Sequence, residues 1–528
     1  MPTVISRTEM LSGDTIQVTE TRNVQRPLLA SWFRAITLST AMIALMAATG
    51  VALFWFPVKR ISANVEINYN EGWNAYRAAM AARRIPLYGA PPLRFGVGTA
   101  YPPVSFHLIG WLGRPDTFVA VGRWISLLSL IAAGIFVALI VRCGGGSREA
   151  AIFSFFLYGI CVALLRADRI GMDDPQLLGE ALSAAGLYFY VRDPDSRRLL
   201  CVSALLFCLA GFTKHNLIAF PGAVAIDLLF RAWKAFVTWA GVLLVSTSLL
   251  TAVTLLVDGR YFLMHILGRG ARTYSYHMAW SGYHHYAEMF QSLLVIATAW
   301  SLCRFRSRRV FVLALILSCG LAFLLAGGFG VDLNIFFNAL AATVIACGIA
   351  LSDVAAAIRE WRSAEVDTNG ALMFALFGIT IMMFVPGQLR RDREKMRVLQ
   401  VQEGEFNSAV ALVKSRQGPA LCESLLLCYE AGKPLEYEPF SVRALVATHI
   451  LPEGDVLQLL KTRHFQTVQV ALRSNEEKLS EEDLRASLTS DQALPDMERR
   501  FTPNFMKELL EDYRLSKRTS EMAIFSPQ

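Results

Sequence analysis

Long apolar segments recur along the first three quarters of this 528-residue chain, and they constrain its fold more than any other feature. A helix needs roughly 17 to 25 mostly apolar residues to cross about 30 Å of hydrocarbon, and about eleven segments of that kind occur here. Their approximate centres are Ala47, Leu130, Phe156, Ala184, Leu206, Ala223, Leu244, Val295, Ile316, Ala342 and Leu376. With 54% hydrophobic and only 18% charged residues, the composition is that of an α-helical multi-pass membrane protein.

Basic connectors predict which side of the membrane each loop faces. Residues 192–198, 231–234 and 304–309 are arginine-rich and fall in every second gap between the apolar segments. Because basic loops stay in the cytoplasm, we expect a cytoplasmic tail over residues 1–34 and a large outer loop over 58–116. The first apolar segment is too long for a signal-peptide core, so it should remain as a span of the plasma or inner membrane.

The transmembrane domain is expected over residues 35–387, and a polar α/β domain over 388–528. Helices are predicted at 405–415 and 501–513, strands at 420–428, 465–472 and 521–525, and a loop or surface helix at 474–492. An odd number of spans places this domain outside, although the basic stretch 389–397 favours the cytoplasm. Cys422 and Cys428 are either a disulfide or two buried thiols.

The first outer loop carries an acid at the start of a helix. Trp73, Tyr76 and Met80 fall on one helical face, with Arg77 on another, which predicts a helix lying in the membrane interface. Glu71 in its first turn is either an ordinary helix-start acid or a carboxylate held for chemistry.

Charged residues also mark the ends of two later apolar segments. In RADRIGMDDPQLLG, the adjacent Asp173 and Asp174 either cap a turn or are suited to activating a hydroxyl or holding a divalent cation. Lys214 in GFTKHNLIAFP either reaches toward the membrane surface or binds a phosphate.

Two further segments contain candidates of low specificity. TYSYHMAWSGYHHYAEMF fits either an interfacial aromatic belt or a sugar-binding platform, and its His285 and Glu288 are a weak metal signal. GGFGVDLNIFFNAL carries Asp332 and Asn334 at the entry to another span.

The order of these motifs resembles the GT-C superfamily of membrane glycosyltransferases, in its protein-mannosyltransferase-like and aminoarabinose-transferase-like branch. The resemblance spans about residues 35–350 and rests on the first-loop acid, on TAYPPVSFHLIGWL at the end of that loop, on R-x-x-R-x-x-x-D-D-P, on T-K-H-N-L and on G-x-x-x-D-x-N-x-F. It implies an enzyme that transfers a sugar, with inversion, from a polyprenyl-phosphate-linked donor to a lipid, glycan or protein of the cell envelope on the outer face.

The same resemblance implies roles for individual residues. The expected catalytic residues are Glu71 as general base, with Asp173 and Asp174; the donor-phosphate residues are Lys214, Arg166, Arg169 and His215; and the substrate-binding residues are Asn70, Tyr101, Tyr276, His277 and Asn334. The chain departs from the family at Asn70, where many members have an aspartate. No cofactor is firmly implied and a divalent cation stays open, while membrane lipids, and no nucleic acid, are expected as further partners.

Two other functions remain open from the sequence. The same acids and lysine are compatible with the translocation path of a transporter or flippase for a lipid-linked or polar solute. A catalytically inactive family member that acts as an assembly partner is the third reading.

Overall fold

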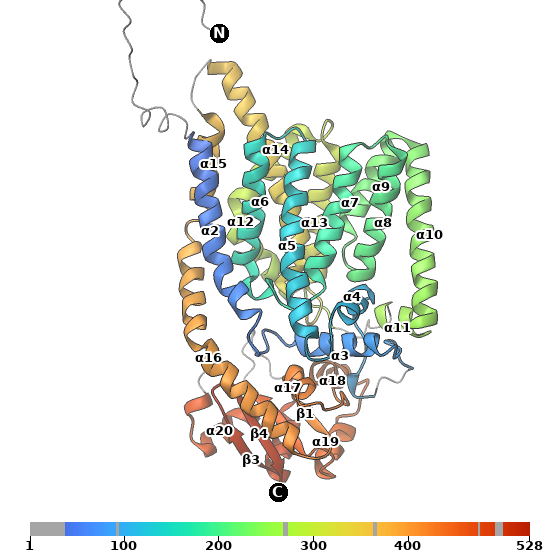
Figure 1. Cartoon of the computed structure of the whole chain (residues 1–528), viewed down its shortest axis with the longest axis vertical. Coiled ribbons are helices and arrows are strands. Elements are labelled where there is room, and N and C mark those ends of the chain that lie inside the picture. The colour runs from blue at the N-terminus through green and yellow to red at the C-terminus, as the bar shows by residue number, and fades with distance from the viewer. Residues whose placement is uncertain (1–36, 91–93, 268–272, 363–366, 474–475, 491–499) are drawn as a thin grey trace, which may run out of the picture.

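The computed structural model describes residues 37–90, 94–267, 273–362, 367–473, 476–490 and 500–528, so the predicted tail 1–34 lies outside the described residues. A bundle of helices carries the first-loop helices and the C-terminal domain at one end (Figure 1). The bundle helices are α2 (Leu38–Arg60), α5 (Phe118–Cys143), α6 (Arg148–Arg166), α7 (Gln176–Arg192), α8 (Arg197–Thr213), α9 (Ala219–Arg231), α10 (Trp233–Val257), α12 (Tyr276–Arg304), α13 (Arg309–Ala326), α14 (Phe337–Arg362) and α15 (Thr368–Thr380).

Every predicted span centre lies inside one of these helices. In the described part of the chain, six helices are by themselves long and apolar enough to cross a membrane: α2, α5, α6, α10, α13 and α14. Helix α14 is the centre of the bundle, with 94% of its apolar window buried, whereas only 11% of the α10 window is buried. The expected multi-pass helical membrane fold is confirmed.

Short helices of the first outer loop lie between the bundle and the C-terminal domain. They are α3 (Asn70–Ala82), the 3-10 turn η1 (Arg94–Gly96) and α4 (Val104–Leu112), and α11 (Phe262–Leu267) lies near them (Figure 1). Helix α3 is the helix predicted for the membrane interface, and protein packs on more than one of its sides, from α4, α5 and α17. The Arg77 side chain is only 3% exposed and donates to the carbonyl oxygen of Gly98.

The C-terminal domain is joined to the bundle by one long helix, α16 (Val385–Ser415), so the predicted boundary at residue 388 falls inside a helix. Its four-stranded sheet has the order β1-β2-β4-β3, with β1 parallel to β2 and the other pairs antiparallel. The strands are β1 (Ala420–Cys422), β2 (Thr467–Ala471), β3 (Tyr513–Arg518) and β4 (Met522–Pro527). The helices are α17 (Leu425–Glu430), α18 (Pro439–Ala447), α19 (Glu453–Lys461), α20 (Glu481–Thr489) and α21 (Pro503–Asp512).

The predicted elements of this domain are mostly present. Helix 501–513 and the strands at 465–472 and 521–525 are confirmed, and 474–492 contains the surface helix α20. The predicted strand 420–428 is wrong after Cys422, because the Ser424 hydroxyl accepts from the Leu427 N–H and starts helix α17. Cys422 and Cys428 form a disulfide.

The two ends of the bundle differ in character. The large loop and the C-terminal domain lie together at one end, and α2 begins at the other (Figure 1). The three basic connectors meet at that other end, where Arg231 pairs with Asp195 and Arg309 pairs with Asp227. The predicted grouping of the loops is therefore present in the fold.

Candidate functional site

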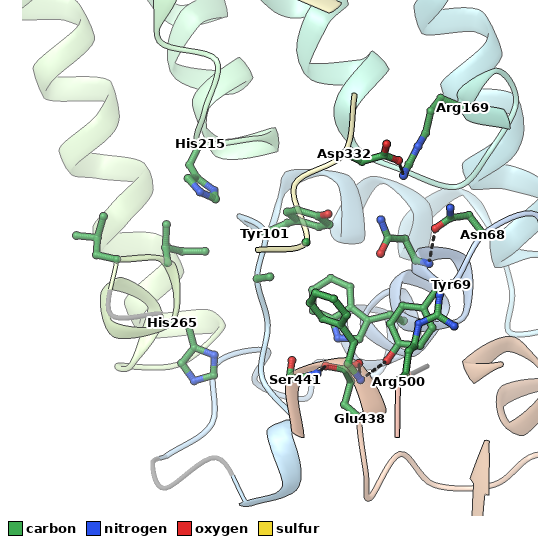
Figure 2. Close-up of a pocket in the computed structure, with 17 residues that line it drawn as sticks. Asn68, Tyr69, Tyr101, Arg169, His215, His265, Asp332, Glu438, Ser441 and Arg500 are labelled. Atoms are coloured by element: carbon green, nitrogen blue, oxygen red, sulfur yellow. Dashed lines mark hydrogen bonds and ion pairs between the residues drawn. The ribbon is translucent and has the colours of Figure 1, made fainter. Parts of the chain in front are cut away.

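Two cavities lie where the bundle meets the first-loop residues, and the outer one is also lined by the C-terminal domain. The outer cavity has a volume of about 470 Å³ and is drawn in Figure 2, and the inner cavity has a volume of about 330 Å³. They adjoin one another, because six residues line both: Asn70, Tyr101, Arg169, His215, Gly330 and Asp332.

Interrupted helices bring the polar side chains into this space. Helix α8 ends at Thr213, its C-cap residue Lys214 has an extended backbone, and the next helix begins only at Ala219. Asp332 caps the 3-10 turn η3 (Leu333–Phe336) by accepting from the Leu333 N–H. Gly330 has a left-handed φ of 76°, and a Cβ there would lie 2.3 Å from the Phe440 ring of the C-terminal domain. The loop therefore packs against that domain only with glycine at this position.

Asp174 lies outside the lining of the inner cavity and pairs with two cations that line it. Its carboxylate lies 3.4 Å from Lys214 Nζ and 3.2 Å from Arg169 Nη1, and it accepts from the Asn70 amide at 3.3 Å. Burial raises the pKa of Asp174, but Lys214 and Arg169 outweigh it and hold that pKa below its ordinary value. Burial lowers the pKa of Lys214, and the facing carboxylate of Asp174 raises it above its usual range. Both groups are therefore charged near neutral pH.

Asp332 is the carboxylate that lines both cavities. One of its oxygens pairs with Arg166 and the other with Arg169, as Figure 2 shows for Arg169. Its side chain remains 25% exposed, whereas that of Asp174 is only 4% exposed. Asp332 is thus the acid of this cluster that is open to a ligand.

Glu71 lies outside this open space. Its side chain is fully buried, both oxygens accept from Arg123 at 2.7 Å, and each also accepts a backbone N–H, from Ile67 and from Asp173. Glu71 lines neither cavity. Its position therefore fits a structural ion pair better than the expected general base.

Asp173 is also withdrawn from the cavities. It is 2% exposed, and a Cβ at Gly122 would lie 2.2 Å from its Oδ1 atom, so it is packed against α5. Burial, with the neighbouring charges of Glu71 and Asp174, raises the pKa of Asp173 well above its ordinary value.

The predicted substrate residues, and the predicted donor-phosphate residue His215, divide into two groups. Asn70, Tyr101, His215 and Asn334 line the cavities, and the Lys214 ammonium lies 4.3 Å from the centre of the Tyr101 ring. Tyr276 and His277 are exposed at the start of α12 and line neither cavity, so the structure does not bring them to the site.

The donor set does not fit a resident divalent cation. Asp174 and Asp332 already face arginine or lysine, and Glu71 is paired with Arg123. Over the described ranges of the chain, no group of three or more His, Cys, Asp or Glu side chains is arranged to hold a metal ion, at His285 and Glu288 or elsewhere.

Sequence reasoning named no site residue in the C-terminal domain. Glu438, Phe440, Ser441 and Arg500 line the outer cavity, and the Arg500 guanidinium lies 4.1 Å from the centre of the Tyr69 ring (Figure 2). No local pattern identifies these residues, because they reach the site only through domain packing. Arg123 was also missed, although a buried arginine within an apolar span is a recognisable signal.

Comparison with known proteins identifies the fold. No protein-family model and no curated protein matches the sequence. The structure is similar to ArnT from Cupriavidus metallidurans in the apo state (14% identity, TM-score 0.57, covering 93% of this chain and 98% of that chain) and bound to undecaprenyl phosphate (14%, 0.51, 92% and 98%). It is also similar to the Archaeoglobus fulgidus oligosaccharyltransferase in the apo form (12%, 0.50, 84% and 70%). This chain therefore has the GT-C fold of those proteins, which is the fold that its motif order predicts.

Proposed function

We propose that this protein is a membrane glycosyltransferase that moves a sugar from a polyprenyl-phosphate-linked donor to a hydroxyl group of a lipid, glycan or protein of the cell envelope. The observation that carries the proposal is the cationic inner cavity, with Lys214 and Arg169 in its wall. A structure of the same fold has undecaprenyl phosphate bound, which supports a lipid phosphate as the ligand.

The chemistry is a single displacement. The acceptor oxygen forms a bond to the anomeric carbon of the sugar while the bond from that carbon to the phosphate oxygen breaks, and the lipid phosphate leaves with the electron pair. Attack from the side opposite the phosphate inverts the anomeric configuration. Lys214, Arg169 and Arg500, which line the cavities, would stabilise the charge that grows on the leaving phosphate.

The acceptor proton needs a carboxylate that the acceptor can reach. Asp332 has the best position, since it lines both cavities and is partly exposed. In this proposal Asp174 positions Lys214, and Glu71 with Arg123 fixes the start of α3. Asp332 thus takes the role that the sequence assigned to Glu71.

The proposed site faces the periplasm or the exterior. The basic connectors lie at the opposite end of the bundle, which favours the cytoplasm for that end. The disulfide between Cys422 and Cys428 supports an oxidising compartment for the C-terminal domain.

Reconstituted protein supplied with undecaprenyl phosphate carrying a radiolabelled hexose or pentose tests this function. The wild type should release undecaprenyl phosphate and transfer the label, and Asp332→Asn should remain folded but lose transfer by roughly 100-fold or more. Movement of intact donor across the bilayer without cleavage of the sugar–phosphate bond would instead support a flippase.

A further inference from the structure

A third cavity, of about 330 Å³, lies at the end of the bundle remote from the C-terminal domain. It is formed by the ends of α5, α7 and α9 and by the connector between α12 and α13. Its polar lining is provided by Tyr190, Asp227, Arg231, Arg306, Arg308 and Arg309. Nothing in the proposed transfer reaction uses these residues.

The carboxylate in this lining, that of Asp227, already accepts hydrogen bonds from other residues of the wall. Asp227 accepts from Arg309 Nε at 2.7 Å and from the Tyr190 hydroxyl at 2.5 Å. Its charge is therefore balanced within the wall, and the remaining arginines leave the cavity electropositive.

Two of the arginines have no side-chain partner among the residues that the structure describes. Arg231 donates to Asp195, but across the described ranges no hydrogen bond or ion pair engages the guanidinium groups of Arg306 and Arg308. Gly145 makes room for one of them, because a Cβ at that position would lie 2.8 Å from Arg308 Nη2. The chain thus leaves guanidinium donors available in a preformed concave site.

Exposed aromatic side chains place this site near the membrane surface. Phe230, Trp233 and Phe305 are 71%, 62% and 45% exposed; Phe230 directly precedes the connector 231–234, Trp233 lies in that connector, and Phe305 lies in the connector 304–309. Aromatic rings at the ends of spans typically lie at the level of the lipid headgroups.

We propose that this cavity binds the phosphate of an anionic phospholipid headgroup in the adjacent leaflet. Planar guanidinium groups match phosphate oxygens in a bidentate geometry, and basic pockets between the ends of membrane helices suit anionic lipids. If the arginines of the connectors served only to set the orientation of the protein in the membrane, they would not need to line a cavity. This binding function lies beyond the proposed transfer reaction and does not depend on it.

The test compares two charge-matched double variants in lipid nanodiscs. Arg306→Gln/Arg308→Gln removes the free guanidinium groups, whereas Arg197→Gln/Arg198→Gln removes two exposed arginines at the same end, outside the cavity. Replacing phosphatidylcholine with phosphatidylglycerol should raise the melting temperature of the wild type. The control variant should keep this shift, and the cavity variant should lose it.

Equal loss of the shift in both variants, or no shift in the wild type, would overturn the proposal. Inorganic phosphate added to phosphatidylcholine nanodiscs should not reproduce the shift, and if it did, the site would be for a soluble anion. If the double variant fails to fold, native mass spectrometry of Arg306→Gln alone should still show fewer retained phosphatidylglycerol molecules than the control, and equal retention would contradict the assignment.

Discussion

At the residue scale, the site is a set of cations fixed in place before any ligand arrives. Lys214 is held by Asp174, and Arg169 is shared between Asp174 and Asp332. Groups positioned in advance need no reorganisation when negative charge develops on a leaving phosphate, and a buried setting strengthens their effect. The carboxylates of the site therefore serve partly to hold its lysine and arginine side chains in position.

Glu71 offers a sharp test of this division of roles. Because Glu71→Gln leaves the buried Arg123 without its charge partner, we expect it to lower the free energy of unfolding by about 3–5 kcal/mol. Thermal unfolding in detergent would measure the loss. Glu394→Gln, which breaks an exposed pair with Arg390, is the control and should change little. An unchanged melting temperature together with lost transfer would instead return the role of general base to Glu71.

Glu438 predicts a pH dependence of stability. Burial raises its pKa from 4.5 to about 7, although it accepts from the N–H groups of Phe440 and Ser441. Between those two values the folded state retains a proton that the unfolded chain has lost, so stability should fall as the pH rises from about 4.5 to about 7.

Melting temperatures of the wild type and of Glu438→Gln across this window would check the prediction. The variant has no group to ionise at this position, so its decline with pH should be smaller. Identical pH profiles for the two proteins would show that Glu438 does not retain the proton.

At the element scale, the site exists because several helices stop short of the end of the bundle. Apolar periodicity predicts those helices well, since each must match the thickness of the bilayer. Their ends were also recognisable, because charged motifs such as RADRIGMDD and TKHN interrupt apolar runs. The environment of α3 was not recognisable: its amphipathic pattern fits an interface, and its coverage depends on residues more than 340 positions later, such as Leu426 against Gly72.

The contact between α3 and α17 should not tolerate a side chain at Gly72. A Cβ there would lie 2.0 Å from the Leu426 nitrogen and 2.4 Å from the Leu425 carbonyl carbon, and neither backbone atom can move without shifting a helix. We expect Gly72→Ala to lower the melting temperature and to speed proteolytic release of the C-terminal domain. Gly241→Ala, in α10 with no atom within 4 Å of the added Cβ, is the control. Equal behaviour of the two variants would show that the two helices are not in close contact.

The large separation in sequence between the bundle and the C-terminal domain explains which site residues could be predicted. Lys214, Arg169 and Asp174 stand in short motifs at span ends, so their residue types and spacing are informative. Arg500 and Glu438 carry no such signal, because their place in the cavity is set by the packing of one domain on another.

At the scale of the whole molecule, the bundle has a basic end and an end that carries the site. The arginine-rich connectors lie at the first, and the cavities, the large loop and the disulfide-bonded domain lie at the second. The charge rule favours the cytoplasm for the first end.

Alkaline phosphatase fusions test this orientation, since that reporter is active only outside the cytoplasm. A fusion after Gln528 should be active, and a fusion within the connector 304–309 should be inactive. The reverse pattern would place the cavity in the cytoplasm and would exclude transfer on the outer face.

The central claim is that the cavity binds a lipid-linked phosphate through Lys214, and equilibrium binding of undecaprenyl phosphate to the purified protein tests it most directly. The wild type should bind saturably, and Lys214→Gln should bind roughly 10- to 100-fold more weakly, as expected for the loss of one charged hydrogen bond. Lys59→Gln, an exposed lysine at the same end of the bundle, should bind like the wild type. Equal affinity of Lys214→Gln and the wild type would contradict the account.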